Sequence, residues 1–190
     1  IQASGLTGTI TLTGAGAPFS ADQVGNLISI EAVDYTSIPL WSAGDSISIG
    51  EKVRWDGNIY ELTAGTGTGT NPPVHTEGAV RTDKSTGATY RYLGDNRGVA
   101  RITAYASANS VTAEVIRRLP DPVSVAPTYR FAWGAWSDKY GYPSTLEVYE
   151  QRLVAAATES EPRTLWFSAA GDFDDHAPST EPDEAFACAI

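Results

Sequence analysis

Short segments of alternating polar and apolar residues, ended by Gly or Pro, recur along this chain and restrict its fold. Thr7–Thr13 alternates Thr with Gly, Ile and Leu, and Gly14–Pro18 ends that segment. Leu27–Val33 has a similar strand-like composition. A period of two residues is typical of a half-buried strand, and 18 Gly and 11 Pro favour strands joined by tight turns. The sequence therefore predicts an all-β fold.

A hairpin is predicted in the middle of the chain. Gly98–Ala106 and Ser110–Ile116 alternate in the same way and are separated by a short turn. We expect this hairpin to join the N-terminal strands in one discontinuous β-domain, formed by residues 1–40 and 95–118. Residues 41–94 are then a small β-module inserted into that domain.

The inserted module is expected to be a sheet with one irregular loop. Asp56 and Gly57 give the strongest hairpin signal in the sequence. The Gly/Thr run Gly65–Pro73 cannot pack regularly, because alternating Gly costs backbone entropy and the Pro pair lacks amide donors. The expected strands are Ser46–Ile49, Glu51–Trp55, Asn58–Leu62 and Thr89–Leu93.

The remaining sequence is expected to form a linker and a separate sheet. Residues 119–129 are rich in Pro, which predicts a linker without helix. In a regular strand Trp133 and Trp136 would point to opposite sides, which predicts one in the core and the other at an interface. The expected strands of the segment 130–190 are Thr145–Tyr149, Arg152–Ala157 and Thr164–Ser168.

The net charge of -10 is concentrated in the last third of the chain. Residues 1–130 carry 12 acidic and 10 basic side chains, a net charge of -2, whereas residues 131–190 carry 11 and 3, a net charge of -8. Such a chain repels a polyanion, so we expect no stable binding of nucleic acid. The acidic part is compatible either with a surface past which DNA slides or with a solvated face that maintains solubility.

The residues that enzymes and metal sites depend on are scarce. His75 lies in a Pro-rich loop, His176 follows an acidic turn, and neither accompanies a nucleophile motif. Asp172–His176 lacks the spacing of a calcium loop, so metal binding is the minor alternative to an acidic turn. We predict a protein that is not an enzyme and has no catalytic residues, metal or cofactor.

The ends of the sequence indicate a piece of a longer protein. The chain contains no Met and stops in the apolar run Ala185–Ile190, which has the character of a cut or unpaired strand. Cys188 is the single cysteine, so an intrachain disulfide cannot form, and we expect it to be a small buried hydrophobic residue. No apolar run approaches the roughly 18 residues of a membrane span.

The order of elements in the C-terminal third resembles the nozzle, or tail tubular B, proteins of short-tailed bacteriophages and their prophage relatives. The resemblance runs from about Thr7 to His176 and is strongest between Trp133 and Asp172. It rests on a Trp-rich lead-in, a Gly-Tyr-Pro turn, a Gln-Arg-Leu strand start, a Pro-Arg-Thr-Leu-Trp-Phe-Ser strand and a closing Gly-Asp pair. Relatives tend to have an aromatic soon after that pair, so Asp174–His176 is a departure.

The resemblance implies an architectural role. Nozzle proteins form an oligomeric tube, a hexamer in the family, below the portal and adaptor of the virion tail, through which the genome leaves. The family implies a propeller-blade-like sheet in 130–190, assembly in the bacterial cytoplasm, and contacts with copies of the chain and with portal, adaptor and other tail proteins. The residues expected to have structural or interface roles are Trp133, Trp136, Tyr142, Pro143, Arg152 and Trp166.

The inserted module resembles the small chitin-binding-like modules of phage tail proteins. It contains a Gly-Asn-Ile-Tyr core at Gly57–Tyr60, the Gly/Thr loop, the run Pro72–Gly78 and a terminal aromatic strand. This predicts an alternative function, contact with a host-surface glycan. Flat aromatic faces can stack on a sugar ring, but the shortage of core in so small a domain favours the alternative that the same side chains fill its core. The aromatic residues concerned are Trp55, Tyr60, Tyr90 and Tyr92.

Overall fold

The computed structural model describes residues 1–33, 36–173, 176 and 183–190. Within these residues the regular elements are strands that pair antiparallel and two short 3-10 helices, which confirms the all-β prediction. The chain forms two compact units, Ile1–Trp133 and Gly134–Ile190. In the part of the chain that the structure describes, no helix is long and apolar enough to cross a membrane.

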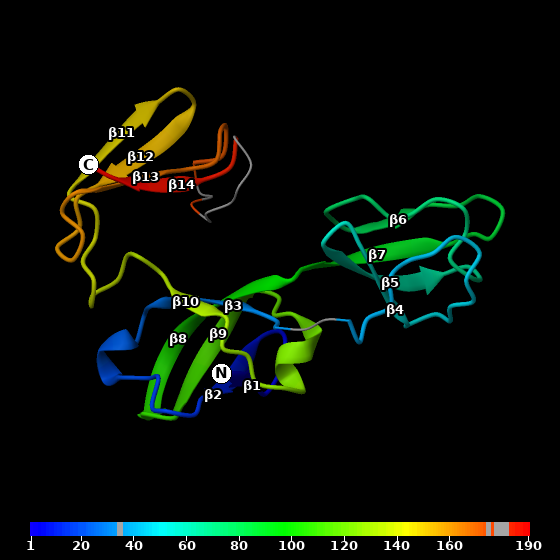
Figure 1. The fold of residues 1–190 in the computed structure, drawn as a ribbon, viewed down its shortest axis with the longest axis horizontal. Coiled ribbons are helices and arrows are strands. Elements are labelled where there is room, and N and C mark those ends of the chain that lie inside the picture. Colours follow the sequence, from blue (N-terminus) through cyan, green and yellow to red (C-terminus); the bar gives the residue numbers. More distant parts are fainter. Residues whose placement is uncertain (34–35, 174–175, 177–182) are drawn as a thin grey trace. The chain divides into compact units, whose positions relative to one another are not determined.

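A six-stranded antiparallel sheet is the main element of the first unit (Figure 1). Its strands are β1 (Gln2–Ala3), β2 (Thr9–Thr13), β3 (Leu27–Glu31), β8 (Arg97–Ser107), β9 (Ser110–Arg117) and β10 (Phe131–Trp133). They lie in the order β1-β2-β9-β8-β3-β10. The helix η1 (Ala21–Gln23) contacts β8, and η2 (Asp121–Ser124) contacts β1. Strands distant in the sequence are therefore direct neighbours.

The alternating pattern of these strands produces a common apolar core. In β2, Ile10 and Leu12 are buried while the three Thr residues are exposed. Ile28 and Ile30 of β3 and Val111 of β9 are buried in the same cluster. Full burial of one such side chain contributes about 1.5–3 kcal/mol. The core therefore depends on contacts between strands that lie up to a hundred residues apart.

The chain leaves the six-stranded sheet after β3, forms the inserted module, and returns to the sheet at the same place in β8. β3 pairs with β8 from Leu27 opposite Arg101 to Glu31 opposite Arg97. The end of β3 and the start of β8 consequently lie side by side (Figure 1). The side-chain amide of Asn96 donates to the carbonyl oxygen of Ala32 at 3.1 Å and ties the two ends together.

The module itself is a four-stranded antiparallel sheet around a small aromatic core. Its strands are β4 (Lys52–Trp55), β5 (Asn58–Ala64), β6 (Ala79–Arg81) and β7 (Thr89–Asp95), in the order β4-β5-β7-β6. The expected strand at Ser46–Ile49 does not form. The Ser48 amide donates to the Glu51 carboxylate at 2.7 Å, and the Glu51 amide donates to the Ser48 carbonyl, so this segment closes a turn instead.

The second unit is a four-stranded sheet whose order follows the chain, as expected of a propeller blade. Its strands are β11 (Thr145–Tyr149), β12 (Arg152–Ala156), β13 (Thr164–Phe167) and β14 (Phe186–Ala189). β14 lies in the apolar run Ala185–Ile190, where the sequence predicts a cut or unpaired strand, but it pairs with β13. Cys188 lies on this edge strand and is exposed, so the expectation that it is buried was wrong.

The junction between the two units differs from the sequence-based boundary. Phe131–Trp133, expected within the segment 130–190, pairs with β3 as β10. Thr128 holds it there, since its hydroxyl donates to the Glu31 carbonyl oxygen at 2.6 Å, and Arg130 pairs with the Glu31 carboxylate at 3.0 Å. β10 ends at Trp133, so Trp136 does not share a strand with it.

The Pro-rich segment 119–129 packs on the first sheet. Leu119 and Val123 are buried in its core, and η2 begins directly after Pro120. The expectation of no helix was wrong here, because Pro122 lies in the first turn of η2, where a missing amide hydrogen costs no hydrogen bond.

Two leucines of the six-stranded sheet provide a matched test of the core. Leu12 is 0% exposed, and Leu27 is 37% exposed. We expect Leu12→Ala to lower the free energy of unfolding by about 2–5 kcal/mol because it leaves a cavity. Leu27→Ala should lower the free energy of unfolding by clearly less, because Leu27 is partly exposed. Urea unfolding followed by circular dichroism measures both, and equal losses would contradict this assignment of the core.

Candidate functional site

The four aromatic residues predicted as a glycan platform do not form one. Tyr60 and Tyr90 are fully buried, and Trp55 and Tyr92 pack against the same cluster. The Tyr60 and Tyr92 ring centroids are 5.8 Å apart, and Trp55 meets Trp41 edge-to-face at 5.4 Å. These side chains fill the core of the module, one of the two roles that the sequence left open.

The buried tyrosines also anchor loops. The Tyr60 hydroxyl donates to the carbonyl oxygen of His75 at 3.0 Å, and the Tyr90 hydroxyl donates to that of Thr68 at 3.4 Å. Burial raises the pKa of both hydroxyls, so they stay protonated as donors. His75 packs with its ring centroid 5.2 Å from that of Tyr60, which gives it a packing role.

Asp83 is the best-connected polar side chain of the module. Its Oδ1 accepts hydrogen bonds from the amide and hydroxyl of Ser85 at 2.7 and 2.6 Å, and from the Thr86 amide at 2.9 Å. Its Oδ2 accepts from the amide and hydroxyl of Thr70 at 2.9 and 2.8 Å. The hydroxyl of Ser85, followed by the amides of Thr86 and Thr70, holds the pKa of Asp83 far below its ordinary value.

Sequence reasoning missed Asp83. Its local signal is the run Asp83–Thr86, in which an Asp precedes Ser and Thr as in an Asx-turn, where the carboxylate accepts from amides two and three residues later. Nothing in that run indicates Thr70, which lies 13 residues away and provides the remaining two bonds. Asp83 therefore joins two loops that the sequence presents as unrelated.

The Gly/Thr loop is tightly packed, contrary to the expectation that it cannot pack regularly. A side chain at Gly65 would place Cβ 2.5 Å from the Ala88 nitrogen, and one at Gly69 would place it 2.6 Å from Cβ of Asp83. Thr68 is buried, and its hydroxyl donates to the Ser42 carbonyl oxygen at 2.5 Å and accepts from the Asp45 amide at 3.0 Å. Alternating Gly here permits close approach of backbone segments.

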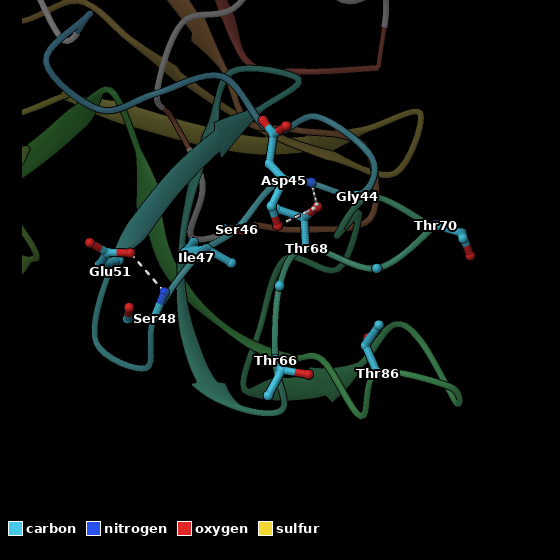
Figure 2. A pocket seen from close by; sticks show the side chains of 12 residues that line it. Gly44, Asp45, Ser46, Ile47, Ser48, Glu51, Thr66, Thr68, Thr70 and Thr86 are labelled. Carbon is cyan, nitrogen blue, oxygen red and sulfur yellow. Dashed lines mark hydrogen bonds between the residues drawn. The ribbon is translucent and has the colours of Figure 1, made fainter.

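A shallow hollow of about 660 Å³ lies between this loop and the turn before β4 (Figure 2). Figure 2 shows the Asp45 amide directed at the Thr68 hydroxyl and the Glu51 carboxylate directed at the Ser48 amide. The hollow is lined by glycines, hydroxyl side chains, two carboxylates and one isoleucine: Gly44, Gly67, Gly69, Ser46, Ser48, Thr66, Thr68, Thr70, Thr86, Asp45, Glu51 and Ile47. We call it the Gly/Thr hollow.

The second unit brings together two of the residues expected to have structural roles, Trp136 and Trp166. Trp136 packs edge-to-face on the buried Trp166, with ring centroids 5.9 Å apart. The ring centroid of His176 lies 4.9 Å from that of Trp136. Asp174 and Asp175 of the acidic cluster lie outside the described residues. Among the described residues, no three potential metal-ligating side chains form a group.

Arg152 holds the loops around this sheet. Its Nη1 donates to the carbonyl oxygens of Ser168 at 2.5 Å and Glu184 at 2.8 Å, and its guanidinium lies 5.4 Å from the Phe186 ring. This is a structural role within the unit. Ser168, completely buried, accepts the Leu153 amide at 2.9 Å and joins the same loop to β12.

The remaining predicted structural residues are Trp133, Tyr142 and Pro143. Trp133 belongs to the first unit, where it packs edge-to-face against Phe19 at 6.3 Å. Tyr142 is exposed, and its hydroxyl donates to Asp138 at 3.1 Å, which raises the pKa of Tyr142. Pro143 is partly buried. Trp133 is therefore in a different unit from the other five residues of this set.

The sheet of the second unit has an exposed apolar surface. Every residue of β11 and β14 is exposed, including Leu146 and Val148 at 60% and 57%. Cross-strand pairing aligns Val154, Phe167 and Phe186 on the opposite face, where the two Phe rings stack 4.4 Å apart. β11 and β14 are also the two edges of the sheet.

Neither the scan against protein-family models nor the search of curated proteins gives a match for this chain.

Replacing the Asp83 carboxylate should destabilise the module in a pH-dependent way. Because its folded pKa is depressed, the stabilisation is complete above about pH 4, the ordinary pKa of Asp, and is lost as the pH falls towards the folded value. We expect Asp83→Asn to lower the thermal midpoint by several degrees at neutral pH and to keep most of this effect at about pH 3, because the folded carboxyl is still ionised there.

Asp56→Asn is the matched control, since Asp56 is exposed at the β4–β5 turn and its positive φ of 49° suits Asn. Thermal unfolding at both pH values measures the difference between each variant and the parent chain. A loss no larger than that of Asp56→Asn, or a loss that disappears at about pH 3, would show that the Asp83 carboxylate is not held ionised by these donors.

Proposed function

We propose that this chain is a structural component of a short-tailed bacteriophage tail, of the nozzle type, and that its second unit supplies contacts between subunits. The observation that carries the proposal is the exposed apolar sheet of residues 134–190. Its best-buried apolar side chains among the described residues are Ala155, Trp166 and Ala185. A sheet with so small a core and so much exposed apolar surface is stabilised when that surface packs against another subunit.

The edges of this sheet support the same role. A free edge presents unpaired amides and carbonyls, and proteins that stay monomeric protect such edges with Lys, Pro or bulges. β11 reads Thr-Leu-Glu-Val-Tyr and β14 reads Phe-Ala-Cys-Ala, so Glu147 is the single charged residue on either strand. Both edges can therefore accept a further strand or pack against an apolar partner surface.

The charge distribution is compatible with a wall along which DNA passes. Residues 131–190 have a net charge of -8. An acidic surface forms no stable contacts with phosphate groups. Assembly and passage of a genome require no catalytic group, metal or cofactor. The proposed partners are further copies of the chain and the adjoining portal and adaptor proteins of the tail.

Self-association through the second unit can be tested by making the same substitution, Val to Glu, at one position in each unit. Val148 on β11 is 57% exposed, and Val125 in the first unit is 82% exposed. We expect the chain to self-associate with rising concentration, and Val148→Glu to weaken this by roughly tenfold or more. A desolvated unpaired carboxylate costs more than about 1.4 kcal/mol, the free energy of a factor of ten. Val125→Glu should have no effect.

Sedimentation velocity gives the association constants, and electron micrographs of the associated material should show rings. Circular dichroism establishes that both variants are folded. A chain that stays monomeric at all concentrations, or one that Val125→Glu disrupts as strongly as Val148→Glu, would rule out this role for the second unit.

A further inference from the structure

The inserted module meets the rest of the first unit through charged side chains. Two ion pairs cross this joint, Lys52 with Asp121 and Arg117 with Asp95. We propose that they form an electrostatic clamp, which holds the module in one orientation on the six-stranded sheet at low salt and releases it at high salt. This inference concerns the first unit alone and is independent of association through the second unit.

The first ion pair joins β4 of the module to η2, which packs on the six-stranded sheet. The Lys52 ammonium contacts Oδ1 of Asp121, and Oδ2 of the same carboxylate accepts a hydrogen bond from Arg118 at 2.8 Å. Arg118 directly follows β9, so it holds the Asp121 carboxylate in place from the side of the sheet. These three side chains are 19–32% exposed, so each pair is partly shielded from solvent but still open to dissolved ions.

The second ion pair joins β7 of the module to the end of β9. The Arg117 guanidinium lies 2.5 Å from Oδ2 of Asp95, and the Arg97 amide donates to Oδ1 of the same carboxylate at 2.8 Å. Asp95 pairs with Asn58 of β5, so this carboxylate belongs to the module sheet. The two sides of the joint therefore each contribute one cation and one anion, a complementary arrangement that favours one docked orientation.

The two apolar cores on either side of the joint are separate. The cluster around Ile28 in the sheet and the cluster around Tyr60 in the module have no member in common within the part of the chain that the structure describes. A shared apolar core would resist salt, because screening does not weaken the burial of apolar groups. Ion pairs are weakened, since the Debye length falls from about 30 Å at 0.01 M salt to about 3 Å at 1 M. The docked orientation therefore depends on ionic strength.

The clamp lies beside the place where the chain can bend. Asn96 separates β7 from β8 and belongs to neither strand, so the change in φ and ψ that a movement of the module requires can occur there. Gly98, two residues later, lets the start of β8 approach Arg118 closely, because a Cβ at Gly98 would lie 2.6 Å from the Arg118 carbonyl oxygen. This approach holds Arg117 and Arg118 next to the strand end that carries Asp95.

The test is a measurement of the distance between two spin labels by pulsed electron paramagnetic resonance. The labels are attached through Thr11→Cys on β2 and Val80→Cys on β6, both exposed positions, in a chain that also carries Cys188→Ser. Excess unlabelled chain removes distances between copies. We expect a narrow distance distribution at about 0.01 M salt and one at least about twofold wider at about 1 M salt.

Variants separate the clamp from the fold. The double variant Lys52→Gln, Arg117→Gln should give the wide distribution at low salt as well. Arg91→Gln is the matched control and should keep the narrow one, because Arg91 pairs with Glu61 inside the module. Circular dichroism establishes that each variant is folded. The proposal is overturned by a distribution that stays narrow at high salt or in the double variant, by one that is already wide at low salt in the parent chain, or by equal widening with Arg91→Gln.

Discussion

The pairing of β3 with β8 is the constraint on which the first unit depends. It brings Glu31 opposite Arg97 and so places the two ends of the inserted module side by side. The opposite edge of β3 receives β10, which carries the chain towards the second unit. One strand therefore determines where the module is inserted and where the first unit ends. A module attached through two adjacent strand ends can vary without disturbing the core around Ile28 and Ile30.

The module is too short to build a large apolar core, and the carboxylate of Asp83 adds polar contacts that stabilise it. Tyr60, Tyr90 and their neighbours supply its apolar centre, and Asp83 supplies the polar one. Since Asp83 is held ionised by donors from two loops, these loops keep a fixed shape despite their Gly and Thr content. Thr70 and Thr86, which both donate to Asp83, also line the Gly/Thr hollow.

Features encoded within a few residues could be predicted, and those encoded by distant partners could not. The alternation in Thr7–Thr13 gave β2, and Asp56-Gly57 gave the β4–β5 hairpin, because both depend on local backbone geometry. The attachment of β10 to β3, the pairing of β14 with β13 and the bonds from Thr70 to Asp83 depend on long-range contacts. The role of Tyr60 stayed open because a strand aromatic can fill a core or face a sugar, although the shortage of core in so small a module favoured the first.

The central functional claim is that the edges of the second unit are contact surfaces. Amide hydrogen exchange measured at low and high protein concentration tests it most directly, with the exposed edge strand β6 of the module as internal reference. Association through the second unit predicts slower exchange at high concentration for β11 and β14 and unchanged exchange for β6. Exchange that stays the same in β11 and β14, or that slows in β6 instead, would contradict the claim.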